Sequence, residues 1–496
     1  MALMGLDIGS TGCKCAIFSN DGELLTHKYH EYARSAGSTE FDGAAIWEYL
    51  CEMIPEAISG CGDTVSAVCV TSLGEAVAPI GSDGNPLMPF MQSVDQRGEK
   101  YITRLDRDLK DHIRDVTGLN PLSRFSLSKM IYVCKEEPRV FEKIWKYMLM
   151  GDFIQFKLCG RAVSDYSLSY RTAAFSLNTY GFDDRILAAA GIDSSKMCSV
   201  VPPCTVIGTV LPETASRLGF PPGTPVVTGG HDTVPENFCT GLIGEGVAGN
   251  GCGTAEGLAV VRKTGTFDPK TLTRYNFSCE PYLKKDHQLI YGINASSGNL
   301  MKWYRDQFFT AEHRKALEDG GSIYRLLDEK APAKPTGLLV IPHFTGSSTP
   351  EYSTLTHGTI TGLTLSTTPL DIYRALMEGT AYELRYIAEK LKECGIPINE
   401  VRASGGGSRS DIWLQIKADV LGAAFSSLEF SDTSVTGCAM MAGVATGVYP
   451  DLETAVGIFV KPGKKFSPAA ENHEYYLRMF ERYKKIRSSM LDIWSN

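Results

Sequence analysis

The sequence contains one kind of segment twice, and this repetition constrains the fold more than any other feature. Residues 4–18 and residues 249–261 each combine a strand pattern with a tight turn of glycine and serine or threonine. The two copies lie far apart in a chain of 496 residues, which is too long for one hydrophobic core. We therefore predict two α/β domains of similar build, residues 1–244 and residues 245–496.

The first of these turns has the chemistry of an anion site. Gly9 and Gly12 are expected to take positive φ, so that successive backbone N–H groups point into a common space. The hydroxyl groups of Ser10 and Thr11 add further donors. Asp7 precedes the turn, where a carboxylate can hold a hard cation such as Mg²⁺. The alternative is an ordinary glycine-containing hairpin with a solvated Asp7.

Two glycine segments in the second half of the chain suit a second ligand. Gly253 and Thr254 form the turn of the second copy. Residues 405–407 are three consecutive glycines between an expected strand at 401–403 and an expected helix at 411–421. Such a junction lets the backbone approach a flat or charged ligand closely. The alternative for the triple glycine is a flexible loop.

A further candidate residue lies at the end of a buried strand at 226–228. Gly229 and Gly230 follow this strand, and Asp232 then stands at the expected start of a helix. Thr233 with a glutamate three residues later resembles a capping box. Asp232 is therefore either a functional carboxylate at a strand end or only the N-cap of that helix.

Composition narrows the class of protein. The net charge of −8 without a long basic run argues against nucleic acid as a partner, and no apolar run has the length of a membrane span. Fourteen cysteines without zinc-ligand spacing indicate reduced, mostly buried thiols in a cytoplasmic protein. Walker, GxGxxG and Gly-x-Ser-x-Gly motifs are missing from the sequence, which disfavours P-loop kinases, dinucleotide dehydrogenases and serine hydrolases.

Hydrophobic periodicity predicts the remaining elements. Residues 99–160 are expected to be mainly helical, and residues 165–172 to form a polar loop rich in hydroxyl groups. Residues 436–448 form an expected helix whose small side chains allow close packing. The other expected helices are 44–59, 369–394, 411–421 and 471–494, and the other expected strands are 23–29, 65–70, 77–80 and 338–342.

Four segments, in this order, resemble the FGGY carbohydrate kinases, a branch of the actin-like ATPase superfamily. They are residues 7–14, 223–232, 251–254 and 404–419, and the last is the most specific match. The resemblance spans nearly the whole chain. It implies an α/β fold of two ribonuclease-H-like domains hinged about an interdomain ATP cleft. Residues 1–244 would bind the sugar and carry the catalytic base, and residues 245–496 would bind the nucleotide.

The family also implies a reaction, in which the γ-phosphate of ATP passes to a hydroxyl group of a small sugar or polyol. A ketose of the xylulose or ribulose type is the favoured acceptor. Asp232 would be the catalytic base and would also touch the acceptor and Mg²⁺, and Asp7 would hold Mg²⁺, partly through water. The residues implied to bind ATP are Gly9, Ser10, Thr11, Gly12, Lys14, Gly253, Thr254, Gly405, Gly406, Gly407 and Ser408.

The expected acceptor residues are Glu75, Asp95 and Arg97, together with Asp232. Carboxylates and an arginine supply the acceptors and donors that a polyhydroxylated ligand needs. The alternatives are that Asp95 and Arg97 form a plain salt bridge holding the loop, and that the acceptor lies nearer Asp152 and residues 165–172.

The chain departs from the family patterns at the acceptor segment. Glycerol kinases carry Arg-Glu where this chain has Gly74 and Glu75, and many members have tryptophan where it has Ser93. Glu75 together with Val94-Asp95-x-Arg97 is similar to kinases of the autoinducer-2 type. An autoinducer-2-type or polyol kinase is therefore the alternative to a ketose kinase.

Two hypotheses from other classes also stay open, an actin-like ATPase that works by conformational change and a sugar-binding regulator that has lost phosphate transfer. The presence of Asp7, Asp232 and Thr254 together disfavours the regulator. The expected partners are a small sugar or polyol and ATP, with neither nucleic acid nor a membrane, and a homodimer is left open.

Overall fold

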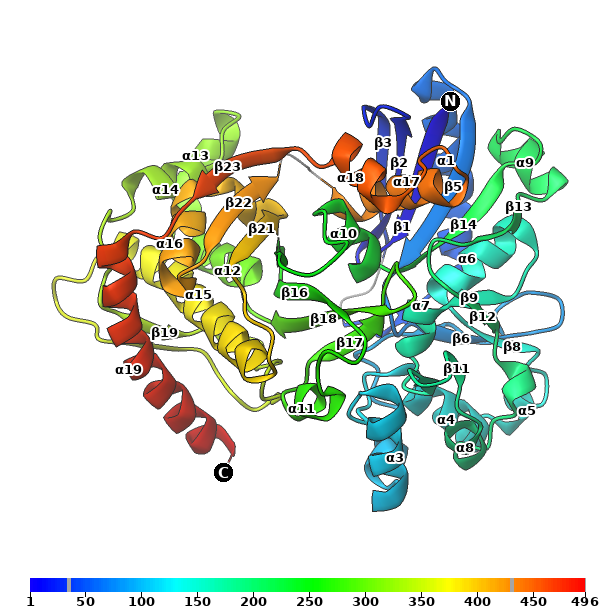
Figure 1. The fold of residues 1–496 in the computed structure, drawn as a ribbon, viewed down its shortest axis with the longest axis horizontal. Coiled ribbons are helices and arrows are strands. Elements are labelled where there is room, and N and C mark those ends of the chain that lie inside the picture. The colour runs from blue at the N-terminus through cyan, green and yellow to red at the C-terminus, as the bar shows by residue number, and fades with distance from the viewer. Residues whose placement is uncertain (34–36, 429–431, 496) are drawn as a thin grey trace. The chain divides into compact units, whose positions relative to one another are not determined.

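The computed structural model describes all residues except 34–36, 429–431 and 496 (Figure 1). The described chain forms two compact units and passes between them more than once. The assignment of separate roles to residues 1–244 and 245–496 stays a prediction. Unit 1 consists of Met1–Ile243, Cys279–Leu289 and Asp432–Val460, and unit 2 consists of Gly244–Ser278, Ile290–Ser431 and Lys461–Asn496.

Unit 1 is built on a six-stranded sheet that contains the predicted first hairpin (Figure 1). In this hairpin β1 (Ala2–Ile8) pairs antiparallel with β2 (Gly12–Ser19), and on its other side β1 pairs parallel with β5 (Val65–Ser72). Strand β14 (Pro225–His231) also runs parallel to β5, so the ends of β1 and β14 lie at the same edge of the sheet. The strand order is β13 (Val206–Thr209), β14 (Pro225–His231), β5 (Val65–Ser72), β1 (Ala2–Ile8), β2 (Gly12–Ser19) and β3 (Leu24–Glu31).

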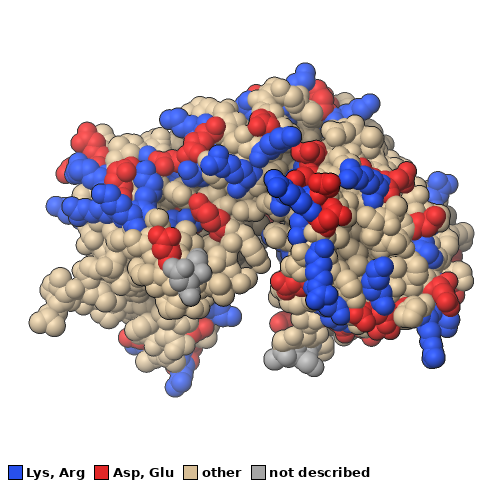
Figure 2. All heavy atoms as spheres, turned by 90° about the horizontal axis from the view of Figure 1, so that it is seen from below, with Lys and Arg blue, Asp and Glu red and all other residues tan. Residues whose placement is uncertain are grey.

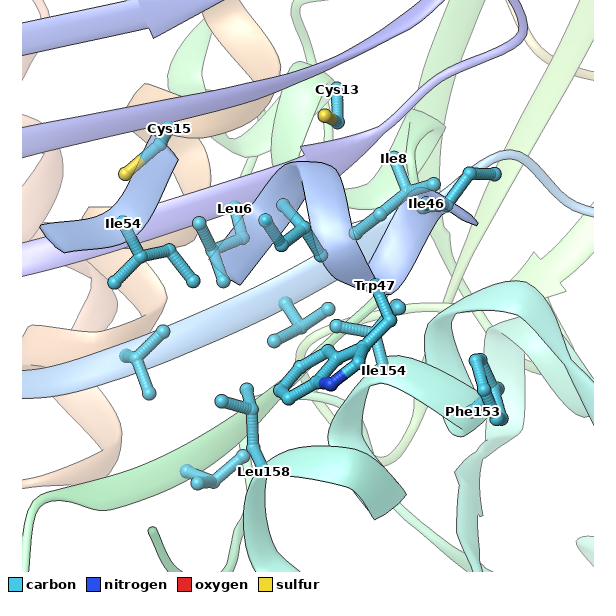
Figure 3. Close-up of a cluster of buried hydrophobic side chains, with 14 of the residues drawn as sticks. Leu6, Ile8, Cys13, Cys15, Ile46, Trp47, Ile54, Phe153, Ile154 and Leu158 are labelled. Atoms are coloured by element: carbon cyan, nitrogen blue, oxygen red, sulfur yellow. The ribbon is translucent and has the colours of Figure 1, made fainter. Parts of the chain in front are cut away.

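Strand β1 is buried on both faces. Leu6 and Ile8 belong to a core that helices α1 (Gly43–Cys61) and α6 (Met150–Cys159) complete, and Figure 3 shows Trp47 of α1 beside side chains of α6. Cys13 and Cys15 of β2 lie in the same core as unbridged thiols. Apolar residues alternating along β1 therefore form a core contact on one face and leave the other face for a different helix.

That second helix is α17 (Thr433–Ala445), which confirms the predicted helix of small residues with a shift of three residues. A Cβ atom at Gly5 of β1 would collide with the carbonyl oxygen of Val435. A Cβ atom at Gly437 would collide with the carbonyl oxygen of Pro235 in α10 (Thr233–Cys239). Glycine at these two positions thus lets α17 pack directly on β1 and α10, the elements that carry Asp7 and follow Asp232.

A second part of unit 1 is helical around a small sheet, as predicted for residues 99–160, but one strand there is unexpected. Strand β8 (Lys146–Leu149) pairs antiparallel with β6 (Val77–Ile80). Its conformation depends on this distant partner, which local periodicity does not show. The elements around it are β4 (Glu40–Phe41), β7 (Phe90–Met91), α2 (Glu99–Thr103), α3 (Arg107–Thr117), α4 (Ser126–Glu136) and α5 (Pro138–Phe141).

The prediction of a loop at residues 165–172 is wrong. The segment contains the end of β9 (Val163–Asp165) and helix α7 (Tyr166–Tyr170). The Asp165 carboxylate accepts hydrogen bonds from the backbone N–H groups of Ser167 and Leu168 and so caps α7. Hydroxyl-rich residues that appear typical of a loop are therefore helical here because an aspartate satisfies the first N–H groups.

Unit 2 repeats the pattern of unit 1, which confirms the predicted duplication. Strand β15 (Ala248–Cys252) pairs antiparallel with β16 (Glu256–Lys263) and parallel with β21 (Glu400–Ser404), as β1 does with β2 and β5. The sheet order is β17 (Ser278–Pro281), β18 (His287–Asn294), β16 (Glu256–Lys263), β15 (Ala248–Cys252), β21 (Glu400–Ser404), β22 (Ala424–Leu428) and β23 (Pro462–Phe466). From Cys279 to Leu289 the residues of β17 and β18 belong to unit 1.

Three long helices of unit 2 confirm their predicted positions. They are α15 (Pro369–Glu393), α16 (Asp411–Leu421) and α19 (Ala470–Ser495), and their apolar side chains share one core. Among the described residues, no helix combines the length and apolar character needed to cross a membrane. Acidic and basic side chains are interspersed over the face shown in Figure 2.

The remaining elements are short. The helices are α8 (Asp184–Ala189), α9 (Pro212–Leu218), α11 (Pro269–Arg274), α12 (Gly298–Phe308), α13 (Thr310–Glu318), α14 (Ile323–Lys330) and α18 (Leu452–Phe459). The strands are β10 (Phe175–Ser176), β11 (Gly181–Phe182), β12 (Ser199–Val201), β19 (Leu339–Ile341) and β20 (Thr359–Thr361).

Candidate active site

Asp7 lies on the face of β1 that meets α17 and is only 5% exposed. Its Oδ2 atom accepts a hydrogen bond from the Ser434 hydroxyl at 2.7 Å, and Lys14 Nζ lies 3.6 Å away. Its Oδ1 atom is buried without a hydrogen-bond partner among the described residues. Burial raises the pKa of Asp7 to about 6, with Lys14 opposing the rise and Asp232 adding to it. An unsatisfied buried acceptor of this kind fits a hydrated cation.

The Lys14 ammonium lies between two carboxylates. Besides Asp7, it donates a hydrogen bond to Asp432 at 3.1 Å. Burial alone would lower the pKa of Lys14, but Asp7 and Asp432 raise it above its ordinary value. The predicted contact between Lys14 and ATP stays a prediction. Sequence reasoning missed Asp432, although its place directly before an apolar helix is a recognisable N-cap signal.

The first turn is correctly placed, but its glycines serve a different purpose from the one expected. Neither Gly9 nor Gly12 has a positive φ. Gly12 is needed because a Cβ atom there would collide with the carbonyl oxygen of His30 on the neighbouring strand. Ser10 and Thr11 at the tip of the turn are exposed to solvent.

Asp232 follows β14 at the N-cap position of α10, yet its side chain caps no N–H group of that helix. The side chain is 36% exposed, and its Oδ1 atom lies 3.1 Å from Nε2 of His231. Desolvation raises the pKa of Asp232 above its ordinary value; His231 opposes the rise, and Glu280 and Glu75 add to it. The geometry thus disfavours the alternative in which Asp232 is only a helix cap.

The predicted capping box is wrong, because the Thr233 hydroxyl is used elsewhere. It donates to the carboxylate of Glu280 and lies 2.7 Å from His231 Nδ1. His231 Nδ1 also lies 3.0 Å from Glu280, which is fully buried. Burial alone would lower the pKa of His231, but Glu280 and Asp232 raise it. Sequence reasoning missed Glu280, since it lies on β17 with no local motif around it.

Glu75 is buried against two arginines. Its Oε1 atom accepts hydrogen bonds from Arg171 and, at 3.4 Å, from Arg124. Burial alone would raise the pKa of Glu75, but Arg171, Arg124 and His231 hold it below its ordinary value. Arg171 comes from the segment expected to be a loop, and no motif marked it.

The same cluster leaves little room beside Gly74, where the sequence departs from the pattern expected of glycerol kinases. A Cβ atom at Gly74 would lie 3.0 Å from Arg171 and 3.1 Å from His231. The space beside Gly74 is therefore already occupied, and Arg171 places a guanidinium on Glu75 from a different segment.

Asp95 and Arg97 form the salt bridge that was considered as their alternative role. The Asp95 carboxylate accepts from the backbone and side chain of Arg97 and from Thr39, and Arg97 also pairs with Glu40 at 2.6 Å. Burial alone would raise the pKa of Asp95, but its hydrogen bonds to Arg97 lower it. A direct contact of either residue with the acceptor stays a prediction. Asp152, the other candidate, is fully buried and hydrogen-bonded to the backbone of Leu149.

In unit 2 the two glycine segments lie side by side. Gly405 takes a φ of +85°, and a Cβ atom there would lie 2.9 Å from the carbonyl oxygen of Cys252. A Cβ atom at Gly407 would likewise lie 3.0 Å from Cys252. Gly253 and Thr254, which follow Cys252, are exposed. Glycine residues thus let the triple-glycine segment lie directly against the second turn, as a shared ligand site requires.

Three polar contacts fix this part of unit 2. The Ser408 hydroxyl donates to the carbonyl oxygen of Gly405 at 2.7 Å, so it closes the turn. Beneath the turn, the fully buried Lys417 pairs with Glu256 and donates to Asn250 at 3.1 Å. The predicted ATP contacts of residues 253–254 and 405–408 stay predictions.

Family comparison identifies the chain. Models of the N-terminal and C-terminal domains of the FGGY family of carbohydrate kinases match residues 2–239 and residues 250–446. The chain belongs to the FGGY family. It is therefore a carbohydrate kinase, a phosphotransferase with ATP as a substrate, and the prediction of the family and of its reaction is confirmed.

Individual FGGY kinases resemble the chain over nearly its full length. A gluconokinase from Bacillus licheniformis is 26% identical, covering 96% of this chain and 94% of its own. An autoinducer-2 kinase from Enterobacter sp. (strain 638) is 25% identical, covering 99% and 95%. The structure of a ligand-bound xylulose kinase from Lactobacillus acidophilus, 21% identical, superposes with a TM-score of 0.90 over 100% of this chain and 99% of that one. The predicted α/β fold of two domains is confirmed.

Proposed function

We propose that this FGGY kinase transfers the γ-phosphate of ATP to a hydroxyl group of a small sugar or polyol, with Asp232 as the catalytic base. The observation that carries the proposal is the state of the Asp232 carboxylate. The carboxylate directly follows a strand, caps no helix, is partly exposed and has a raised pKa. A general base needs this combination of reach and proton affinity.

In the proposed reaction the acceptor hydroxyl attacks the γ-phosphorus in line with the leaving oxygen. A new oxygen–phosphorus bond forms, the bond to the β-phosphate oxygen breaks, and ADP leaves. Asp232 takes the hydroxyl proton and later releases it to solvent. The exposed turns at Ser10–Thr11 and Gly253–Thr254 are proposed to donate hydrogen bonds to phosphate oxygens, and the triple glycine to face the nucleotide.

Mg²⁺ is proposed to bind at Asp7, with Asp232 as the second carboxylate. Among the described residues, no group of three or more histidine, cysteine, aspartate or glutamate side chains is placed to hold a metal alone. Mg²⁺ commonly uses one or two carboxylates plus water and substrate phosphates, so the unpartnered Oδ1 of Asp7 fits this mode. When bound, the ion supplies charge neutralisation at the transferring phosphoryl group.

For the acceptor we propose a ketose of the xylulose or ribulose type, bound near Glu75 with the Asp95–Arg97 bridge shaping the loop. Relatives named autoinducer-2 kinase and gluconokinase give two alternatives. One observation also suits the gluconate type. The Arg124 side chain is 34% exposed beside Glu75, which Arg171 already pairs, and an exposed guanidinium suits a carboxylate on the acceptor.

A coupled assay of ADP formation with a panel of acceptors tests this function. The panel contains xylulose, ribulose, glycerol, glucitol, gluconate and autoinducer-2, each with ATP and Mg²⁺. One acceptor is expected to raise ADP formation far above the rate with ATP alone. ADP formation that no acceptor raises, but that rises steeply with protein concentration, would instead indicate an assembling ATPase.

The cellular setting is proposed from the thiols. All fourteen cysteines are unbridged, and most are buried. Free thiols in this number suit a reducing compartment, so we place the kinase in the cytoplasm.

Light scattering after gel filtration decides between a monomer and the homodimer left open above.

A further inference from the structure

We infer that His231 is a positioning residue for the catalytic base. It is the middle member of a series of side-chain contacts from Glu280 through His231 to Asp232. The inference rests on the proposed role of Asp232. The two ring nitrogens of His231 face two different carboxylates. Nδ1 lies 3.0 Å from Glu280 Oε2, and Nε2 lies 3.1 Å from Asp232 Oδ1.

Glu280, at the end of this series away from Asp232, is held in place inside unit 1. Glu280 is fully buried, and the Thr233 hydroxyl donates to its carboxylate. The backbone next to Glu280 is also held in place, because the N–H of Cys279 donates a hydrogen bond to the Tyr170 hydroxyl at 2.9 Å. A carboxylate held in this way fixes the imidazole that it binds, as the acidic member of a catalytic triad does.

The backbone and surroundings of His231 also leave its ring little freedom. Its N–H donates to the Ser167 hydroxyl at 2.9 Å, and Gly230 before it has a φ of +77°. On the other side, the ring fills the space that a side chain at Gly74 would need. The imidazole therefore cannot turn without losing its contacts with both carboxylates.

Asp232, by contrast, depends on His231. Within the described chain its carboxylate takes no capping bond from α10, and His231 is the side chain that holds one of its oxygens. Fixing Oδ1 therefore holds the other carboxylate oxygen in one defined orientation. A base must lie within hydrogen-bond reach of the proton it takes, and small misplacements are costly. Losing the His231 contact should therefore lower kcat and leave the KM values for acceptor and ATP nearly unchanged.

Two substitutions at one position separate the two contacts. In H231Q the amide nitrogen reaches about as far as Nε2, so a donor to Asp232 is retained. In H231N the amide lies near the place of Nδ1, so only the Glu280 side is retained. We expect H231N to lower kcat by about 10–100-fold, and H231Q to stay within about fivefold of wild type. Both variants should keep KM values within about threefold.

A matched control removes a similar buried histidine in unit 2. His343 Nε2 lies 3.3 Å from the buried Glu383. H343N should alter thermal stability without lowering kcat. This control separates a general effect of losing a buried histidine–glutamate contact from an effect on Asp232.

The outcomes decide between the alternatives. A kcat for H231N within twofold of wild type would contradict the inference, as would equal losses in H231N and H231Q or a change confined to the acceptor KM. If H231N does not fold, E280A decides, since it removes the acceptor for His231 Nδ1 and leaves His231 in place; an unchanged kcat there also contradicts the inference. An active D232N variant overturns the proposed function itself, whereas a normal H231N beside an inactive D232N overturns only the positioning role.

Discussion

In unit 2 the buried carboxylate of Glu383 is bonded on both oxygens, whereas in unit 1 that of Asp7 keeps one oxygen without a hydrogen-bond partner among the described residues. Glu383 accepts from Arg487, Tyr483 and His343. Burial alone would raise its pKa, but Arg487 and His343 hold it low, while the pKa of Asp7 is raised to about 6. We assign Glu383, which is bonded on both oxygens, to stability of the fold, and we assign to chemistry Asp7, whose Oδ1 lacks a partner, and Asp232, whose side chain is partly exposed.

The largest expected effect on stability comes from removing a partner of the fully bonded Glu383. R487A leaves the Glu383 charge buried and removes its main partner. The free energy of unfolding should fall by about 3–5 kcal/mol, because an uncompensated buried charge is costly. Urea unfolding measures this change, and kcat at a temperature where R487A stays folded should be close to that of wild type. A stable R487A with low kcat would contradict the assignment of Glu383 to fold stability and of Asp7 and Asp232 to catalysis.

Glu75 sharpens the comparison, because it lies in unit 1 but is paired like a structural residue. If it also accepts hydrogen bonds from the acceptor, E75A should raise the acceptor KM by roughly 10- to 150-fold, the equivalent of about 1.5–3 kcal/mol. The ATP KM should change much less. E75Q is the control, since it retains a hydrogen-bond acceptor for Arg171. An unaltered acceptor KM in E75A would show that Glu75 does not bind the acceptor and only pairs with Arg171 and Arg124.

Asp7 should behave in the opposite way to Arg487. D7A should lower turnover by roughly 10–100-fold and raise the Mg²⁺ concentration needed for half-maximal rate, as loss of an outer-sphere metal partner does. Its free energy of unfolding should fall little, because the removed carboxylate is incompletely bonded. A Mg²⁺ titration and urea unfolding of the same preparation measure both quantities. An unchanged Mg²⁺ titration would leave Asp7 with only a hydrogen-bonding role in the turn.

The smallest effect concerns pH and has opposite signs for the two carboxylates. The pKa of Asp7 rises from 3.8 to about 6 on folding, so its contribution to stability is lost as pH increases through this window. The pKa of Glu383 is lowered, so its contribution is lost as pH decreases below about 4.5. D7N should therefore gain stability relative to wild type between pH 4 and 6, by about 1.4 kcal/mol per pH unit at most. A difference that does not depend on pH would contradict the shift at Asp7.

Local sequence patterns predicted the parts of the site that each lie on one element. The hairpin with Asp7, the strand end with Asp232 and the glycine turns of unit 2 were all correctly placed, because strand alternation and glycine punctuation are local signals. The partners of these residues were missed. Glu280, Arg171 and Asp432 reach the site from distant segments, and which of them meet depends on how the sheet and α17 pack. The strand β8 was missed for the same reason. Glycine is needed at position 12 because the neighbouring strand leaves no room for a side chain, and not because the backbone has a positive φ.

The central claim is that the Asp232 carboxylate takes the proton of the acceptor hydroxyl, and single-turnover phosphorylation tests it most directly. Wild type and D232N are mixed at excess enzyme with labelled ATP, Mg²⁺ and the acceptor found in the panel, and then quenched and analysed for the sugar phosphate. We expect D232N to bind ATP normally and to form the product about 10²–10⁴-fold more slowly than wild type. Product formation by D232N at the wild-type rate would contradict the claim.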